Sequence, residues 1–168
     1  MTQMALSLGS NIERDTHIRF ALEALHELFG ELEISPVYET RAVGFAGPDF
    51  YNLVVVANTS LQLDGVLDAL RHIEKNAGRD RQDKRIQSRN LDIDILLFGD
   101  ANLRGQGRNV PRLEIEHATY VLKPLADVLP DMLHPVLGLC FADLWRDFEP
   151  KEPTPKRIEF ASGPEHAS

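Results

Sequence analysis

Hydrophobic and polar positions follow two different periods along the chain, and these periods predict its helices and strands. Residues 15–29 and 64–77 carry apolar side chains at spacings of three and four, which predicts helices with one buried face. Gly30 and Gly78 follow these segments, as expected of helix C-terminal caps. Short apolar runs rich in β-branched and aromatic residues predict strands at residues 5–8, 32–40, 50–61 and 91–98.

The order of these elements predicts the fold class. Strand, helix, strand, strand, helix, strand is the split β-α-β arrangement, so we expect an α+β, ferredoxin-like fold in which both helices cover one face of an antiparallel sheet. Residues 101–111 are expected to form a hairpin or loop, residues 118–128 a strand remnant that leads into a short helix, and residues 141–148 a further helical turn. We predict a single domain over residues 1–148.

The C-terminal segment has a different composition. Residues 149–168 are rich in Pro, Lys and Glu and contain few apolar side chains. Such a segment has little to bury, so we predict a frayed or disordered tail.

Asp92 and Asp94 are the only charged residues in the predicted strand at 91–98. Side chains two positions apart point to the same face of a strand, so the two carboxylates should emerge side by side. They repel each other and are costly to desolvate next to a core, and a hard divalent cation would offset both effects. The alternative is a surface pair on an edge strand, neutralised by nearby arginines.

A basic segment precedes this strand. Residues 78–89 contain Arg79, Arg81, Lys84, Arg85 and Arg89. A basic segment alone is usually a solvated surface. Arginines beside paired carboxylates, however, supply the cations and the Mg²⁺ ligands that a nucleoside triphosphate needs.

Composition narrows the class of partner. The chain has 168 residues and a net charge of −8, which argues against nucleic acid and anionic membranes as partners. The basic segment is therefore a local exception that fits a small anionic ligand. Cys140 is the only cysteine, which excludes an internal disulfide. No apolar run has membrane-spanning length and we see no secretory signal, so we expect a cytoplasmic location.

Several segments together resemble a known family, 6-hydroxymethyl-7,8-dihydropterin pyrophosphokinase, over roughly residues 4–148. The segments, in the order of the family, are LSLGSN at 6–11, VYET at 37–40, GPDFYN at 47–52, IEKNAGRDR at 73–81, RNLDIDILLFG at 89–99, VP at 110–111 and YVLKPLAD at 120–127. The resemblance implies transfer of diphosphate from ATP to the hydroxymethyl group of 6-hydroxymethyl-7,8-dihydropterin, with release of AMP, in folate biosynthesis. Both partners are then small molecules, and no obligate protein partner is evident.

The resemblance also implies roles for individual residues. Asp92 and Asp94 would hold two Mg²⁺ ions that bridge the phosphates of ATP. The implied catalytic set is Asp92, Asp94, Arg79 and Arg89, and the implied nucleotide-binding set is Glu74, Arg81 and Arg112. Thr40 and Val43 would offer backbone groups to the pterin, Phe50 and Tyr120 would flank its ring, and Asn52 would bind its polar edge.

Four positions depart from the family pattern. Ile86 stands near the position of a covering Trp, Arg112 replaces a His, Ala118 replaces an Arg and Arg41 replaces a Pro. Three hypotheses follow: an active pterin diphosphokinase, a paralogue that binds nucleotide or pterin with altered or lost catalysis, and a ferredoxin-like protein–protein module. The retained carboxylates and arginines favour the first, whereas Ile86 and Ala118 favour the second.

Overall fold

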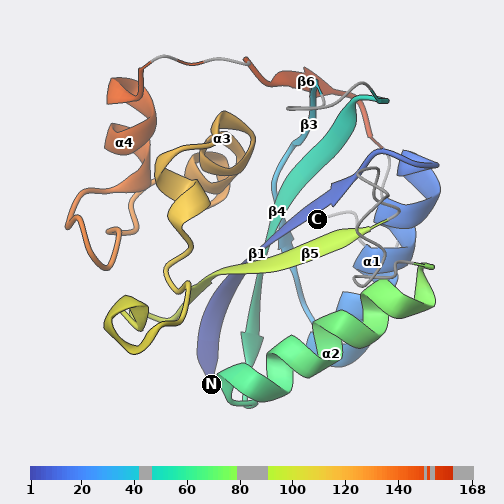
Figure 1. The fold of residues 1–168 in the computed structure, drawn as a ribbon, viewed down its shortest axis with the longest axis horizontal. Coiled ribbons are helices and arrows are strands. Elements are labelled where there is room, and N and C mark those ends of the chain that lie inside the picture. The colour runs from blue at the N-terminus through green and yellow to red at the C-terminus, as the bar shows by residue number, and fades with distance from the viewer. Residues whose placement is uncertain (42–46, 79–90, 150, 152–153, 161–168) are drawn as a thin grey trace.

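A single antiparallel sheet organises the molecule, as seen in a computed structural model that describes residues 1–41, 47–78, 91–149, 151 and 154–160 (Figure 1). The six-stranded sheet has the order β5-β1-β4-β3-β6, and β2 also pairs with β4. The strands are β1 (Thr2–Ser10), β2 (Glu33–Ile34), β3 (Val37–Thr40), β4 (Phe50–Thr59), β5 (Asp92–Phe98) and β6 (Lys156–Ile158). The order β5-β1-β4-β3 is that of the predicted ferredoxin-like arrangement, which is confirmed.

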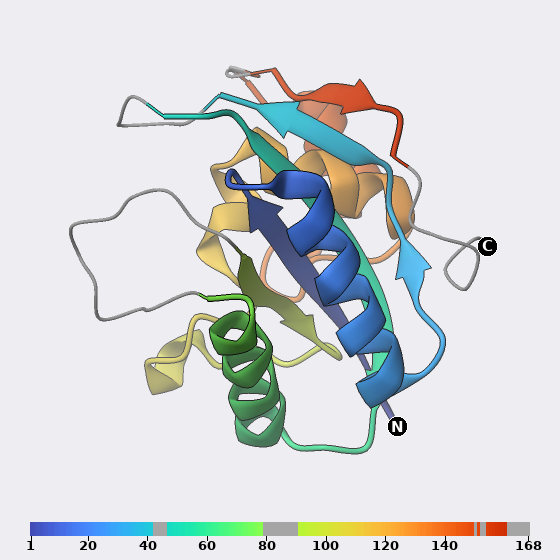
Figure 2. The same ribbon diagram turned by 90° about the vertical axis from the view of Figure 1, so that its right-hand side faces the viewer.

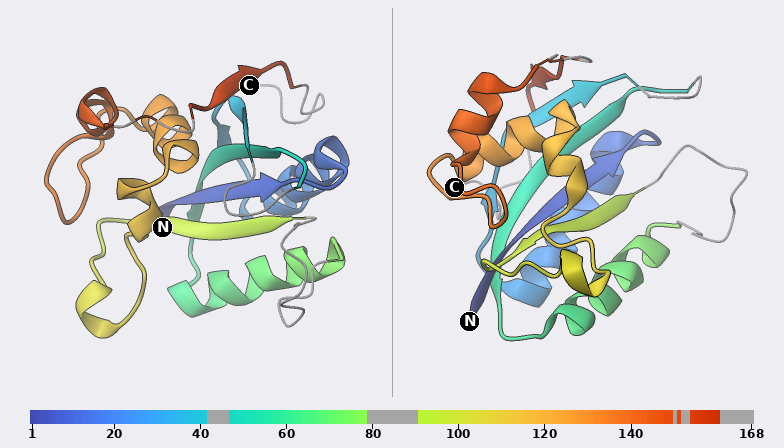
Figure 3. Two further views of the ribbon diagram at one scale, coloured as in Figure 1. Left: turned by 45° about the horizontal axis from the view of Figure 1, so that its top comes forward. Right: turned by 60° about the vertical axis from the view of Figure 1, so that its left-hand side comes forward.

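Helices cover both faces of this sheet. The predicted helices are α1 (Arg14–Phe29) and α2 (Leu63–Asn76), and both pack on one face, with Ile18, Leu22 and Leu70 among their buried residues. On the other face lie α3 (Thr119–Val128) and α4 (Phe141–Asp147), joined to the sheet by the 3₁₀ turns η1 (Arg104–Gln106) and η2 (Leu113–Glu116). Figure 2 shows α1 in front of the sheet with α3 behind it, and Figure 3 shows the same layers from two further sides.

The central strands are buried on both faces, which explains their long apolar runs. In β4, Leu53 and Val55 belong to the core beneath α1 and α2, whereas Val54 packs with α3. In β1, Leu6 and Ala5 divide in the same way. A strand between two helical layers needs apolar side chains at successive positions, and the alternation of faces sorts them between two cores.

The predicted strand at residues 32–40 is in fact two strands. β2 ends at Ile34 and β3 begins at Val37, with Pro36 between them. Proline has no N–H to donate to a ladder. Ser35 bridges the interruption, because its N–H donates to Val54 O and its Oγ accepts from Val54 N, both over 2.9 Å.

One prediction for the C-terminal third was wrong, and the described part of another segment differs from what we expected. Residues 118–128 contain no strand remnant, since α3 begins at Thr119. The expected tail at 149–168 contains β6, which pairs antiparallel with β3, and Ile158 and Phe160 pack against the core under α1. A few apolar side chains are enough to hold β6 in place because the edge strand β3 also provides backbone hydrogen bonds. The domain boundary at residue 148 stays a prediction.

None of the helices in the described part of the chain combines the length and the apolar character that crossing a bilayer requires.

His134 predicts a pH-dependent stability. It is 1% exposed, and its Nδ1 accepts hydrogen bonds from Val136 N and Leu137 N at 3.0 and 3.2 Å, which requires a neutral ring. Burial lowers the pKa of His134 from 6.5, although Glu116, 3.6 Å from its Nε2, opposes the shift and Arg104 adds to it. The unfolded chain therefore binds more protons below pH 6.5, so the stability that neutral His134 contributes is lost as the pH falls.

We expect the melting temperature of His134→Asn to fall less than that of the wild type between pH 7 and pH 5. The asparagine can still accept from the backbone but cannot be protonated in this range. His72→Gln, at an exposed position on α2, is the matched control. An equal fall in melting temperature between pH 7 and pH 5 for His134→Asn and the wild type would contradict the prediction.

Candidate active site

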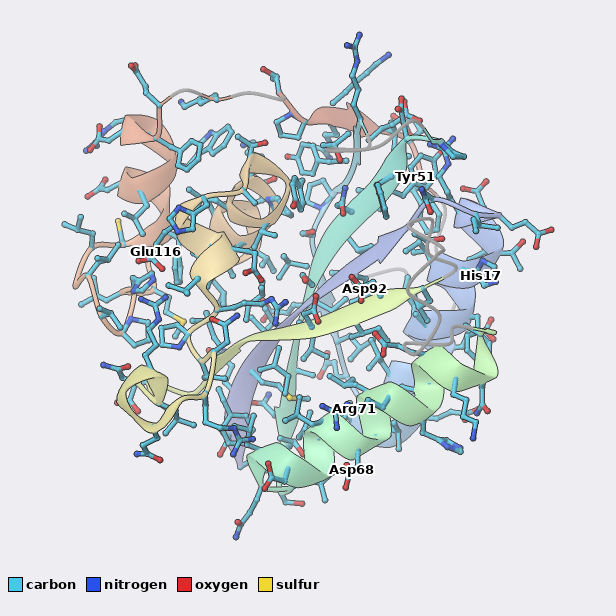
Figure 4. The ribbon with its side chains drawn as sticks, in the orientation of Figure 1. His17, Tyr51, Asp68, Arg71, Asp92 and Glu116 are labelled. Atoms are coloured by element: carbon cyan, nitrogen blue, oxygen red, sulfur yellow. The ribbon has the colours of Figure 1, made fainter. Side chains whose placement is uncertain are left out.

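Asp92 and Asp94 lie on β5 and share one face of the strand, as the sequence predicts. The intervening Ile93 is 2% exposed and packs on the opposite side, in the core with α2. Figure 4 places Asp92 near the middle of the molecule. Both carboxylates reach a cavity of about 300 Å³ on the face of the sheet that carries η2 and α3.

This cavity brings together most of the predicted site residues that the structure describes. It is lined by residues of β1, β3, β4, β5, η2 and α3 that are distant in sequence. The predicted residues among them are Thr40, Phe50, Asn52, Asp92, Asp94, Arg112 and Tyr120. Val43, Arg79, Arg81 and Arg89 lie outside the described residues, as does Ile86, so their predicted roles stay predictions.

One wall of the cavity carries an oriented amide. Asn52 is 8% exposed, and its Nδ2 donates to Thr40 Oγ1 over 2.8 Å. This bond spans the paired strands β3 and β4, so the neighbouring backbone fixes both side chains. The buried amide therefore presents a fixed set of polar atoms to the cavity, whereas Phe50 adds an aromatic surface beside it.

Gly9 is a site residue that the sequence analysis did not assign. It pairs with Asn52 of β4 on one side and with Asp92 of β5 on the other. A Cβ atom at this position would lie 3.2 Å from Asn52 Oδ1, so a larger residue would displace the amide. A glycine inside a strand often marks such a close approach. The strand predicted at residues 5–8 stopped short of Gly9, whereas β1 extends to Ser10, so this signal was missed.

Another part of the cavity wall is charged. Arg112 Nη2 lies 3.6 Å from Asp94 Oδ2, and Arg112 also forms an ion pair with Glu114. Tyr120 closes this side of the cavity. Burial raises the pKa of the Tyr120 phenol, and the carboxylates of Glu114, Asp92 and Asp94 raise it further against the opposing effect of Arg112. Tyr120 therefore remains a neutral hydroxyl beside a predominantly negative group of side chains.

Glu74, for which nucleotide binding was predicted, is buried and contacts β5. Within the described residues its side chain does not line the cavity; it is 2% exposed, and its Oε2 accepts a hydrogen bond from Ile93 N over 2.8 Å. Glu74 thus holds the backbone of β5 between the two aspartates. The predicted contact with nucleotide stays a prediction.

The donor set fits a hard divalent cation. The described residues contain no group of three or more His, Cys, Asp or Glu side chains that could enclose a metal ion. Mg²⁺ rarely uses such a cage; it binds one or two carboxylates and takes its remaining oxygens from water and substrate phosphates. Asp92 and Asp94 would hold it here, since both face one cavity with room for a ligand.

Fold and site together define the class: a ferredoxin-like α+β protein with a carboxylate pair, an arginine, and an amide–aromatic wall in one cavity. The chain belongs to the 7,8-dihydro-6-hydroxymethylpterin-pyrophosphokinase (HPPK) family, since the family model matches residues 5–130. The resemblance noted in the sequence is thereby confirmed.

Comparison with individual relatives supports the same family. The chain is 36% identical over 138 residues to the 2-amino-4-hydroxy-6-hydroxymethyldihydropteridine pyrophosphokinase of Aquifex aeolicus, covering 81% of this chain and 86% of that protein. It is 40% identical over 134 residues to the protein of that name from Pseudomonas aeruginosa, covering 77% and 82%. It is also similar to the folic acid synthesis protein fol1 of Pneumocystis carinii, at 35% identity, but spans only 19% of that longer protein.

Solved structures support the fold. The wild-type HPPK-DHPS of Plasmodium falciparum with STZ-DHP superposes with a TM-score of 0.69 over 86% of this chain, at 16% identity, and the chain spans 43% of that protein. At this identity the comparison supports the arrangement of helices and strands alone.

Proposed function

We propose that this protein transfers the β,γ-diphosphate of ATP to the hydroxymethyl group of 6-hydroxymethyl-7,8-dihydropterin, as a step of folate biosynthesis. The observation that carries the proposal is that one cavity holds both halves of the chemistry. Asp92, Asp94 and Arg112 form its charged side, and Asn52 and Phe50 form a side suited to a flat, polar heterocycle. Family membership identifies the two substrates.

The pterin half of the site works by orientation. Asn52 can donate and accept, so it suits the alternating donors and acceptors on the edge of a pterin. Phe50 and Tyr120 offer aromatic surfaces to the ring, and Thr40 keeps the Asn52 amide in place. Fixing the ring in this way would direct its hydroxymethyl oxygen toward the carboxylate side of the cavity.

The nucleotide half works by charge. The hydroxymethyl oxygen bonds to the β-phosphorus, the bond from that phosphorus to the α,β-bridging oxygen breaks, AMP leaves, and the hydroxyl proton is released. Such transfer asks the protein for positioning and charge neutralisation rather than for a covalent nucleophile. Asp92 and Asp94 would hold the Mg²⁺ ions, for which we propose two, and these would neutralise phosphate charge. Arg112 supplies a guanidinium fork to phosphate oxygens.

The alanine at position 118 favours the second candidate, a paralogue that binds nucleotide or pterin with altered or lost catalysis. The family pattern has a cation at this position, but Ala118 is 8% exposed and packs in the core with α3. Residue 118 therefore supplies no side-chain cation where the family pattern has one. Arg112 keeps the cation at the family's histidine position, which favours retained catalysis.

Release of AMP from ATP and 6-hydroxymethyl-7,8-dihydropterin tests the proposal and separates these candidates. We expect Mg²⁺-dependent AMP formation that requires both substrates. Binding of an ATP analogue without turnover would favour the binding paralogue. If neither substrate binds, the protein–protein module is the hypothesis that remains. An ATP-consuming step fits the predicted cytoplasmic location, and we propose no obligate protein partner.

Asn52→Ala is expected to weaken pterin binding by about ten- to a hundredfold, because the polar edge of the ring loses its partner in a buried place. Nucleotide affinity should change little. Titration calorimetry with the pterin, and separately with an ATP analogue and Mg²⁺, measures both. Asn58→Ala, at an exposed position further along β4, is the matched control. Equal weakening of both ligands would indicate a disturbed fold instead.

A further inference from the structure

The guanidinium of Arg112 stands between two carboxylates on the cavity wall. Its Nη2 is 3.6 Å from Asp94 Oδ2, and its Nε forms an ion pair with Glu114 Oε2. The backbone is fixed as well, because Arg112 N donates to Leu96 O of β5 over 2.9 Å. The side chain therefore reaches the metal-binding strand from an anchored position.

A divalent cation held by Asp94 would change this arrangement. Arg112 and the cation would both bind the Asp94 carboxylate, and two positive groups on one carboxylate repel each other. A bound cation would therefore compete with Arg112 for the Asp94 carboxylate and weaken their ion pair. Glu114 lies at the start of η2, two residues beyond Arg112, so it can keep the guanidinium at the wall when Asp94 no longer does.

We infer that Glu114 is a positioning residue, which holds Arg112 toward the nucleotide phosphates once Asp94 binds the metal. The inference rests on the proposed function. Glu114 Oε2 is covered although the side chain as a whole is 39% exposed, and Arg112 is the cation that this oxygen contacts among the described residues. Glu114 acts through Arg112, since a carboxylate placed directly against phosphate would repel it.

A double-mutant cycle tests this dependence on Arg112. Affinity for a non-hydrolysable ATP analogue with Mg²⁺ is measured by calorimetry for the wild type, Glu114→Gln, Arg112→Gln and the double variant. We expect Glu114→Gln to weaken binding about five- to tenfold when Arg112 is present. In the Arg112→Gln background the same change should leave affinity unaltered or improve it, because only a repulsive charge is lost.

Two controls separate positioning from damage to the fold. Glu114→Asp, which keeps the charge, should restore most of the affinity. Glu116→Gln, on the same 3₁₀ turn but paired with Arg104, should leave nucleotide affinity unchanged. A Glu114→Gln effect of equal size in both Arg112 backgrounds would overturn the inference alone. Absence of Mg²⁺-dependent analogue binding in the wild type would overturn the proposed function, and the inference with it.

Competition at Asp94 gives a second readout that does not involve turnover. In the absence of nucleotide, Arg112→Gln should bind Mn²⁺ several-fold more tightly than the wild type, because the Arg112 guanidinium no longer competes for Asp94. Arg104→Gln removes the same charge from a residue that does not line the cavity, and its effect should be small and screened by salt. Equal Mn²⁺ affinities of Arg112→Gln and the wild type would overturn the competition.

Discussion

Replacing Asp92 or Asp94 by alanine is expected to abolish diphosphate transfer while the fold persists. Each change removes a carboxylate ligand from the place where cations neutralise the phosphates. Losing such electrostatic stabilisation of a transition state costs on the order of 3–4 kcal/mol, which lowers kcat at least about a hundredfold. Initial rates of AMP formation at saturating Mg²⁺ measure the effect. Near-normal turnover by either variant would refute the metal assignment.

The same variants carry an opposite prediction for stability. Two carboxylates on one face of β5 repel each other when no metal is bound, and Arg112 offsets part of this repulsion at Asp94. Removing one carboxylate, Asp92 above all, should therefore leave the metal-free protein equally or more resistant to heat. Asp100→Ala, an exposed change just beyond β5, serves as the matched control for charge. A marked loss of thermal stability in Asp92→Ala would show that the carboxylate is structural, and its effect on activity would then need no metal.

Periodicity predicted the elements that bury apolar side chains on a regular spacing. The helices α1 and α2 and the strand β4 each have such a spacing, and the structure confirms them. Pro36 is evident in the sequence, but its division of the predicted strand into β2 and β3 was not predicted. The side chain of Ser35 replaces part of the interrupted hydrogen bonding by accepting from Val54 N. β6 was missed because its position depends on the free edge of β3, which is distant in sequence.

For the site, alternation along a strand placed Asp92 and Asp94 together, but spacing says nothing about what lies opposite them. Gly9 meets Asn52 and Asp92 only through strand register, and Glu114 gains its role only where η2 approaches β5. The phosphate-binding role predicted for the basic segment at 78–89 stays a prediction, since residues 79–90 lie outside those described. Long-range pairing therefore accounts for the site residues that local pattern missed.

Glu74 shows this limit most clearly, and it predicts a large effect. A glutamate near the end of a helix suggests an exposed side chain, yet Glu74 is buried. The strand that it contacts, β5, lies at the edge of the sheet and pairs only with β1 among the described strands. The N–H of Ile93 points away from β1, and Glu74 Oε2 accepts it. An edge strand in a buried position needs such an acceptor, since an unpaired N–H is costly there.

Glu74→Ala is therefore expected to lower both stability and activity. The buried Ile93 N–H loses its acceptor, at a cost of about 1–3 kcal/mol, which corresponds to a fall in melting temperature of roughly 3–10 °C for a protein of this size. Activity should fall more than the folded fraction does, because Ile93 lies between Asp92 and Asp94 and a looser β5 misplaces both carboxylates.

Glu74→Gln keeps an acceptor oxygen and a similar volume, so it should retain most of the stability that the alanine variant loses. Thermal unfolding of the three proteins, together with the Mg²⁺ concentration needed for half-maximal AMP formation, separates the two roles. A raised Mg²⁺ requirement in Glu74→Ala at temperatures where it remains folded would show that Glu74 positions the metal-binding strand. Unchanged melting and an unchanged Mg²⁺ requirement would show that the hydrogen bond to Ile93 contributes to neither, since β5 would then keep its position without it.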